Sequence, residues 1–170
     1  MAEAIVVNSK IQKPSVCNAL ETLLIHKDVA EKFAPQIAEN LFAKNVELRG
    51  DDAFQQLAGV DVKPATVDDW TAEYLDYILA VRVVDSLDDA ITHINEFGSH
   101  HTDSIVTANG AAADQFHLEV DSACVFWNTS TRFADGAEFG FGAEIGISTD
   151  KLHARGPMAL EELCSYKYLS

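Results

Sequence analysis

Apolar residues along the chain change their spacing in a way that predicts alternating strands and helices. Apolar runs of strand length occupy residues 21–26, 46–49, 78–84, 104–107 and 123–127. Between them, apolar residues recur at helical spacing over residues 28–44, 86–95 and 111–120. Strands that alternate with helices are typical of a parallel sheet flanked by helices, so the pattern predicts an α/β fold.

Polar residues mark where two of these helices begin. Asp28 is placed to cap the first helix, and Ser86, with Asp89 three residues later, matches a helix-capping signature. The polar stretch from Gly50 to Pro64 predicts a loop or broken structure.

A glycine-dense stretch follows residue 128 and predicts a loop whose backbone approaches another surface closely. No G-x-G-x-x-G sequence follows a strand and opens a helix, so the pattern predicts no dinucleotide-binding fold in this chain. The sequence M-A-L-E-E-L-C at residues 158–164 indicates a C-terminal helix.

Composition narrows the class of protein. The chain has 170 residues, 48% of them apolar, which is typical of one globular domain. Asp and Glu number 27 against 12 Lys and Arg, a net charge of −15 that argues against a nucleic-acid partner. No apolar run approaches the roughly 20 residues of a membrane span, and no leader is recognised, so we expect a cytoplasmic protein without a membrane partner.

Three cysteines are candidates for chemistry. Cys17, Cys124 and Cys164 are widely spaced and odd in number, which argues against disulfides. Cys17 follows the loop sequence K-P-S-V, where a reactive group is well placed, although by spacing alone a lone cysteine is more often a small buried side chain. Buried structural roles are expected for Cys124 and Cys164. The adjacent histidines 100 and 101 have no third ligand at a known spacing, so no metal site is predicted.

Four stretches of the chain together carry a family pattern. They are residues 14–26 (P-S-V-C-N-A-L-E-T-L-L-I-H), 74–91 (Y-L-D-Y-I-L-A-V-R-V-V-D-S-L-D-D-A-I), 119–132 (E-V-D-S-A-C-V-F-W-N-T-S-T-R) and 139–168 (F-G-F-G-A-E-I-G through S-Y-K-Y). In this order they resemble gamma-glutamyl phosphate reductases, members of the aldehyde-dehydrogenase superfamily. The resemblance covers nearly the whole chain.

The resemblance implies an α/β fold of the aldehyde-dehydrogenase catalytic type, with a parallel-rich sheet flanked by helices. Residues 1–135 are then the catalytic α/β domain, and residues 136–170 form the glycine-rich loop and a C-terminal helix or tail packing on it. The family's N-terminal cofactor-binding domain is absent from this chain, so we expect the chain alone to be inactive. In the full-length protein the resemblance implies a homodimer or higher oligomer.

The resemblance also implies a reaction, the NADPH-dependent reduction of L-glutamyl 5-phosphate to L-glutamate 5-semialdehyde and phosphate in proline biosynthesis. Cys17 would be the nucleophile that forms a thioester, since a thiolate is both a good nucleophile and a good leaving group. Its own backbone N–H would help to stabilise the oxyanion. We expect such a thiol to titrate below the ~8.5 of free cysteine.

Glu73 is the candidate cofactor-binding residue. It opens E-Y-L-D-Y, where the wider superfamily has an E-x-F-G-P motif whose glutamate holds the nicotinamide ribose. The alternative is an exposed carboxylate at a loop end. Trp70, nearby, is expected in the core.

The segment Asn128–Phe133 follows the last predicted strand, and open parallel sheets place ligands at the carboxyl ends of their strands. Ser130, Thr131 and Arg132 are therefore candidates for binding the glutamyl α-carboxylate, with a solvated arginine as the alternative reading of Arg132. The stretch K-L-H-A-R-G-P-M offers two further candidates. His153 and Arg155 either meet phosphate or hold the C-terminal helix.

Two other readings of the whole chain stay open. In the first, the chain is a non-catalytic binding or assembly module with the same fold, in which Cys17 is a core residue. In the second, it is the reductase portion of a bifunctional pyrroline-5-carboxylate synthase.

Overall fold

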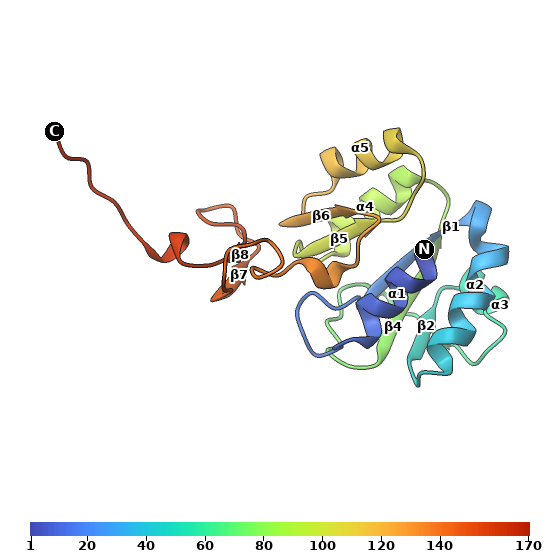
Figure 1. Ribbon diagram of the computed structural model, residues 1–170. Helices are drawn as coiled ribbons and strands as arrows, with labels where there is room; N and C mark the ends of the chain where they lie inside the picture. The colour runs from blue at the N-terminus through green and yellow to red at the C-terminus, as the bar shows by residue number, and fades with distance from the viewer.

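A four-stranded parallel sheet with strand order β1-β4-β2-β3 lies at the base of the molecule in the computed structural model, which describes all 170 residues (Figure 1). Its strands are β1 (Thr22–His26), β2 (Glu47–Gly50), β3 (Lys63–Pro64) and β4 (Ile78–Val84). The central strand β4 pairs with β1 on one side and with β2 on the other. Leu79, Ala80 and Val81 of β4 are fully buried, as expected for a parallel strand covered on both faces.

Three helices belong to this sheet: α1 (Ala2–Ile11), α2 (Lys27–Phe42) and α3 (Asp52–Leu57). A 3-10 turn, η1 (Val67–Trp70), precedes β4. Helices α1 to α3 and the sheet share one apolar core of 13 buried residues. Its members include the fully buried Ile37 and Leu41 of α2 and Phe54 of α3. Burial of this apolar surface is the main force that holds the helices on the sheet.

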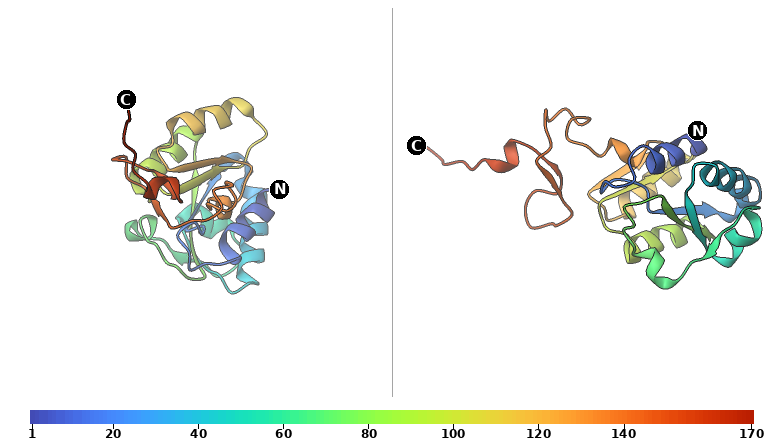
Figure 2. Two further views of the ribbon diagram at one scale, coloured as in Figure 1. Left: turned by 60° about the vertical axis from the view of Figure 1, so that its left-hand side comes forward. Right: turned by 90° about the horizontal axis from the view of Figure 1, so that it is seen from below.

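A second, smaller unit lies beside the first in all three views (Figures 1 and 2). It has two parallel strands, β5 (Thr102–Ile105) and β6 (Cys124–Trp127), with helices α4 (Leu87–Phe97) and α5 (Gly110–Glu119). Its own core contains only three buried residues, Ile91, Phe116 and Val120. The 3-10 turn η2 (Thr131–Phe133) follows β6 and packs against α1 of the first unit.

The C-terminal segment projects from these two units (Figures 1 and 2). It contains the antiparallel pair β7 (Gly146–Ser148) and β8 (Gly156–Met158), then a short 3-10 turn, η3 (Glu161–Leu163). The predicted C-terminal helix is therefore wrong: residues 161–170 are exposed, so no apolar surface stabilises a helix there. Cys164, expected to be buried, is exposed for the same reason. The division at residue 135 stays a proposal.

The predicted α/β fold is confirmed, and five predicted strands and three predicted helices are present, with β5 beginning two residues earlier than expected. Ser86 caps α4 by accepting from the Asp89 N–H, as predicted. The cap of α2 is His26 instead of Asp28, since the His26 ring accepts from the Asp28 N–H. The short helix α3 lies in the stretch where a loop or broken structure was expected. No helix in the structure is long and apolar enough to cross a membrane.

Candidate active site

Cys17 lies in the loop that joins the end of α1 to β1, with its side chain exposed. Two backbone hydrogen bonds hold this loop in place. The Ala19 N–H donates to the Val16 carbonyl at 3.0 Å, and the Leu20 N–H donates to the Ser9 carbonyl at 3.0 Å. Cys17 is thus presented on a turn whose backbone is fixed by hydrogen bonds.

The segment that follows β6 packs against the Cys17 loop. Asn18 is buried and donates from its side-chain nitrogen to the Ala134 carbonyl at 3.0 Å. The Arg132 guanidinium donates to the Asn18 side-chain oxygen and, at 3.2 Å, to Gln12 Oε1. Two parts of the chain that are more than 110 residues apart therefore meet directly beside Cys17.

Ser130 and Thr131 complete this contact on the α1 side. The Ser130 hydroxyl lies 2.9 Å from the Ser9 hydroxyl, and the Thr131 N–H donates to Ser9 Oγ at 3.3 Å. Both residues are buried, and the Thr131 hydroxyl makes no hydrogen bond to the protein. Of the three predicted substrate-binding residues, Arg132 alone is partly exposed.

Glu73 is exposed in the loop between η1 and β4, and this loop lies close enough to Cys17 for its charge to act on the thiol. Trp70, expected in the core, is only half-buried. Its ring packs edge-on against the His93 ring, with the ring centroids 5.3 Å apart. The structure therefore brings Cys17, Glu73 and the Ser130–Arg132 segment to one region.

The surroundings of Cys17 disfavour the thiolate in this chain. Partial burial raises the pKa of the Cys17 thiol, and the carboxylates of Glu144 and Glu73 raise this pKa further. The backbone N–H groups of Cys17 and Asn18 act in the opposite direction without reversing the shift. The pKa of the thiol thus moves upward here, opposite to the direction that the sequence analysis expects.

A cavity of about 970 Å³ opens beside these residues. It runs between β1 and β5, and Cys17, Glu73 and Thr131 contribute to its lining. About half of the lining residues are apolar. A large cleft that combines apolar walls with convergent polar groups is typical of small-molecule sites.

No family model matches the chain. Similarity to curated proteins is nevertheless high. Gamma-glutamyl phosphate reductases from Geotalea daltonii and Limosilactobacillus reuteri are 60% and 57% identical to it over 169 and 168 residues. These alignments cover 99% of this chain and 40% of each relative. The chain matches part of the gamma-glutamyl phosphate reductases. It spans about two fifths of their length.

Solved structures show the same similarity. The crystal structure of a gamma-glutamyl phosphate reductase from Thermotoga maritima has a TM-score of 0.94 and 49% identity, over 98% of this chain and 40% of that one. A lactaldehyde dehydrogenase, 17% identical with a TM-score of 0.60 over 76% of this chain and 36% of that one, shares the fold. The aldehyde-dehydrogenase type of fold and the resemblance to the reductases, both expected from the sequence, are confirmed.

Two of the predicted site residues lie elsewhere, between β7 and β8. Arg155 donates to the Asp121 carbonyl at 3.1 Å and pairs with the Asp121 carboxylate at 3.0 Å, while His153 is exposed. Arg155 therefore attaches the C-terminal segment to the start of β6, which is the structural role that the sequence analysis considered. The C-terminal segment that Arg155 attaches contains the β7–β8 hairpin instead of the expected helix.

Gly136, in the glycine-rich stretch, and Glu144, which had no signal in the sequence, contact each other near Cys17. The Gly136 N–H donates to Glu144 Oε2 at 2.9 Å, and this contact holds Glu144 where its charge acts on Cys17. A side chain at Gly136 would place its Cβ only 2.4 Å from the Ala143 carbonyl oxygen, so this position needs glycine. The close backbone approach predicted for the glycine-rich stretch is present here.

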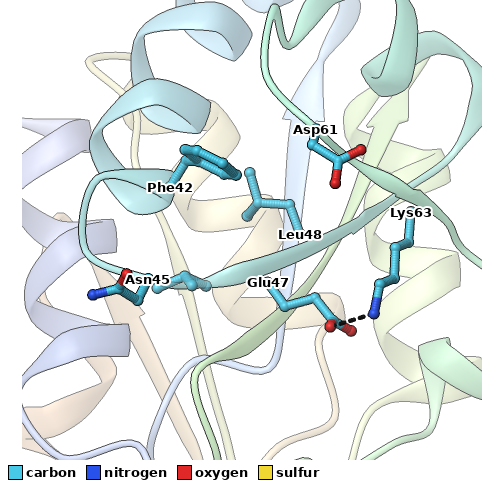
Figure 3. A pocket seen from close by; sticks show the side chains of 7 residues that line it. Phe42, Asn45, Glu47, Leu48, Asp61 and Lys63 are labelled. Atoms are coloured by element: carbon cyan, nitrogen blue, oxygen red, sulfur yellow. Dashed lines mark hydrogen bonds and ion pairs between the residues drawn. The ribbon is translucent and has the colours of Figure 1, made fainter.

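A smaller hollow of about 330 Å³ lies at the end of α2, between Phe42, Leu48 and the Glu47–Lys63 ion pair (Figure 3). None of the predicted site residues lines it. Cys17, Glu73 and Thr131 line the larger cleft instead.

Proposed function

We propose that this chain carries the acyl-accepting part of a gamma-glutamyl phosphate reductase, with Cys17 as the nucleophile. The observation that carries the proposal is the position of Cys17, which is exposed on a fixed turn at a large cleft, beside the Asn18–Arg132 contact. The identity of 60% and 57% to two reductases of that name supports the same reaction.

In the proposed reaction, the Cys17 thiolate attacks the acyl carbon of L-glutamyl 5-phosphate, and inorganic phosphate leaves with the electron pair of the broken C–O bond. The product is a thioester at Cys17. The backbone N–H of Cys17 is a candidate donor to the oxyanion of the tetrahedral intermediate. Reduction of the thioester and departure of Cys17 as a thiolate release L-glutamate 5-semialdehyde.

NADPH, when bound, supplies the hydride for the reduction. Glu73 fits this cofactor, because an exposed carboxylate at the cleft can accept hydrogen bonds from two ribose hydroxyls. An engineered glycolyl-CoA reductase with bound NADP⁺ shares the fold at 15% identity and a TM-score of 0.62. Most contacts to NADPH are expected from the part of the relatives that this chain does not span.

We assign the glutamyl α-carboxylate to Arg132, with Ser130 and Thr131 beside it. The Arg132 side chain is only half-buried, and its contact with Asn18 orients the guanidinium beside Cys17. Thr131 also lines the cleft, and its buried hydroxyl has no hydrogen-bond partner in the protein, so it can bind a polar substrate group that reaches it. Arg132→Ala in the full-length enzyme should raise the KM strongly, and an unchanged KM would remove Arg132 from the site.

The non-catalytic alternative has one observation in its favour. No Lys, Arg or His is among the groups that lower the pKa of Cys17, so this chain alone contains no cationic partner to activate the thiol. We infer that activation depends on the remainder of the full-length enzyme or on the bound cofactor, and that the chain alone does not turn over.

The acyl-transfer half-reaction tests the proposal without any cofactor. The pure chain is mixed with L-glutamyl 5-phosphate at pH 9, where more of the thiol is ionised, and the intact mass is recorded. We expect one glutamyl group on Cys17, removable by hydroxylamine, with one phosphate released per group. Cys17→Ser should abolish it, whereas Cys164→Ser, which removes the other exposed thiol, should not. Modification of Cys164 alone would contradict the assignment.

A further inference from the structure

Two separate sets of contacts hold the residues that follow Glu73. Tyr74 is held from the β2 side, and Leu75 is held from the side of the Cys17 loop. Glu73 itself makes no hydrogen bond to the rest of the protein through its side chain. Its place beside Cys17 is therefore decided by what holds its neighbours.

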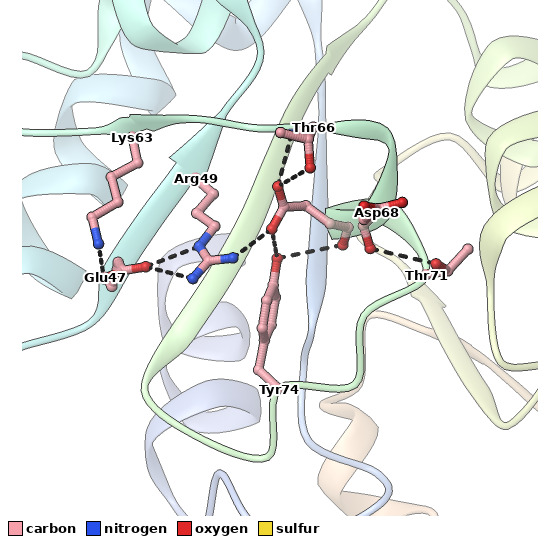
Figure 4. Close-up of polar contacts among 8 residues, drawn as sticks. Glu47, Arg49, Lys63, Thr66, Asp68, Thr71 and Tyr74 are labelled. Atoms are coloured by element: carbon pink, nitrogen blue, oxygen red, sulfur yellow. Dashed lines mark hydrogen bonds and ion pairs between the residues drawn. The ribbon is translucent and has the colours of Figure 1, made fainter.

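Asp69 is the centre of the first set, and Figure 4 labels its partners Arg49, Thr66 and Tyr74. This buried carboxylate accepts from the Thr66 N–H at 2.7 Å and from the Thr66 hydroxyl at 2.9 Å, which closes the turn η1. Its other oxygen accepts from Arg49 at 2.7 Å and from the Tyr74 hydroxyl at 2.7 Å. A buried carboxylate whose two oxygens are both satisfied fixes the groups around it.

Arg49 connects the Asp69 carboxylate to strand β2 of the sheet. Its guanidinium pairs with Glu47 at 2.9 Å on the same strand, β2, and lies 5.1 Å from the centre of the Tyr74 ring. Burial alone would raise the pKa of Asp69, but the Thr66 N–H and the Arg49 guanidinium outweigh it and hold that pKa far below its ordinary value. Asp69 is thus charged over the whole physiological range.

Glu21 is the centre of the second set. It accepts from the Leu75 N–H at 3.1 Å and from the Lys10 ammonium at 2.8 Å, and Lys10 is completely buried at the end of α1. Glu21 lies four residues after Cys17 in the same connecting segment. One end of the Glu73 loop is therefore joined directly to the segment that carries the nucleophile.

We propose that Asp69 is a positioning residue: through the hydroxyl of Tyr74, and with Glu21 at Leu75, it holds Glu73 at the cleft that Cys17 also lines. This deepens the proposed function and rests on it for the meaning of Glu73, the residue assigned to the cofactor. Asp69 and Tyr74 bind neither substrate nor cofactor. Their effect is to keep the carboxylate and the thiol in one arrangement before any ligand arrives.

The coupling between Glu73 and Cys17 can be measured in the chain itself. Alkylation of Cys17 by iodoacetamide, located by mass spectrometry over a pH series, reports how readily the thiol ionises. Because the Glu73 charge disfavours the thiolate, Glu73→Gln should move the titration midpoint of Cys17 downward. Below that midpoint the alkylation rate should rise by roughly twofold to threefold.

Tyr74→Phe removes the hydroxyl that donates to Asp69 Oδ1 and leaves the ring in place. We expect the effect of Glu73→Gln to lose most of its size in a Tyr74→Phe background, because the released Glu73 then samples positions away from Cys17. Asp69→Asn should act in the same direction. A thermal melt of each variant establishes that it is folded.

Two matched controls separate positioning from a general loosening of the site. Tyr77→Phe removes a tyrosine hydroxyl that makes no hydrogen bond, three residues further on, and should leave the full effect of Glu73→Gln. Glu144 also raises the pKa of Cys17 but is held by the Gly136 N–H. The effect of Glu144→Gln should therefore be unchanged by Tyr74→Phe.

An effect of Glu73→Gln that stays equal in the Tyr74→Phe and Asp69→Asn backgrounds would overturn the proposal. So would the absence of any effect of Glu73→Gln in the otherwise unchanged chain. Neither outcome depends on acylation of Cys17 by the acyl phosphate. Failure of the proposed function and failure of the positioning role are thus distinguishable.

Discussion

The unit around β4 and the unit around β5 and β6 differ in how much apolar surface each one buries by itself. The first has a core of 13 buried residues, whereas the second has three. The second unit is attached through polar contacts such as Ser9–Ser130 and Asn18–Ala134, with the cleft between the two units. The candidate site therefore lies between the two units, where hydrogen bonds contribute to the arrangement of the side chains.

One pair of identical substitutions tests this difference most strongly. Phe54→Ala removes a fully buried ring from the larger core and should lower the free energy of unfolding by about 3–5 kcal/mol. Phe116→Ala in the smaller core should cost about 2 kcal/mol, because Phe116 also lines the cleft and leaves a less enclosed void. Urea unfolding of both variants measures the two values. Equal losses would show that the second unit is packed as tightly as the first.

The boundary between the units should respond to acid through His93. Its ring lies on α4, beside Trp70, and its Nδ1 is 2.7 Å from the Arg82 guanidinium on β4. Burial, and then the charge of Arg82, lowers the pKa of His93 from 6.5 to about 4, while Asp89 opposes the shift. The folded protein thus binds this proton less readily than the unfolded chain.

The stability that His93 contributes is therefore fully present above the ordinary histidine pKa of 6.5 and is lost as pH falls from there to about 4. We expect a loss of about 2 kcal/mol across this window, to which the buried His101, with its pKa also lowered by burial, adds in the same direction. His93→Asn should flatten the curve of unfolding free energy against pH. A curve of unchanged slope would assign the acid response to other groups.

The smallest effect is expected at the end of the chain. Residues 164–170 are all exposed and belong to no helix or strand, so their removal should change the unfolding free energy by less than about 0.5 kcal/mol. Thermal unfolding of the shortened chain, compared with the full chain at equal concentration, measures the difference. A larger drop in the unfolding midpoint temperature would show that residues 164–170 stabilise the folded chain.

Several elements were predictable because their signal is local. The run I-L-A-V-R-V-V predicts β4, since a strand buried on both faces must be apolar at nearly every position. The Ser86 cap is visible because the residue that accepts and the N–H that donates are three positions apart. Cys17 was assigned from the resemblance of its segment, and the structure places it in an exposed loop.

Other features had no local signal. Lys10 reads as a surface lysine, yet it is completely buried because Glu21 reaches it from the other end of the loop. Helix α1 has no capping side chain to mark its start, and it was not predicted. The expected C-terminal helix had a suitable sequence but has no surface to pack against.

Spacing along the chain is enough to predict the central strands, the helices α2, α4 and α5, and the parallel α/β class, because these elements have local apolar patterns. Only the tertiary structure decided that Arg132 would meet Asn18, that Asp69 would hold Tyr74, and that Glu73 and Glu144 would act on Cys17. Such contacts join residues from different elements. Their formation, and the direction in which they move the pKa of Cys17, depends on which side chains the packed fold brings together and withdraws from water.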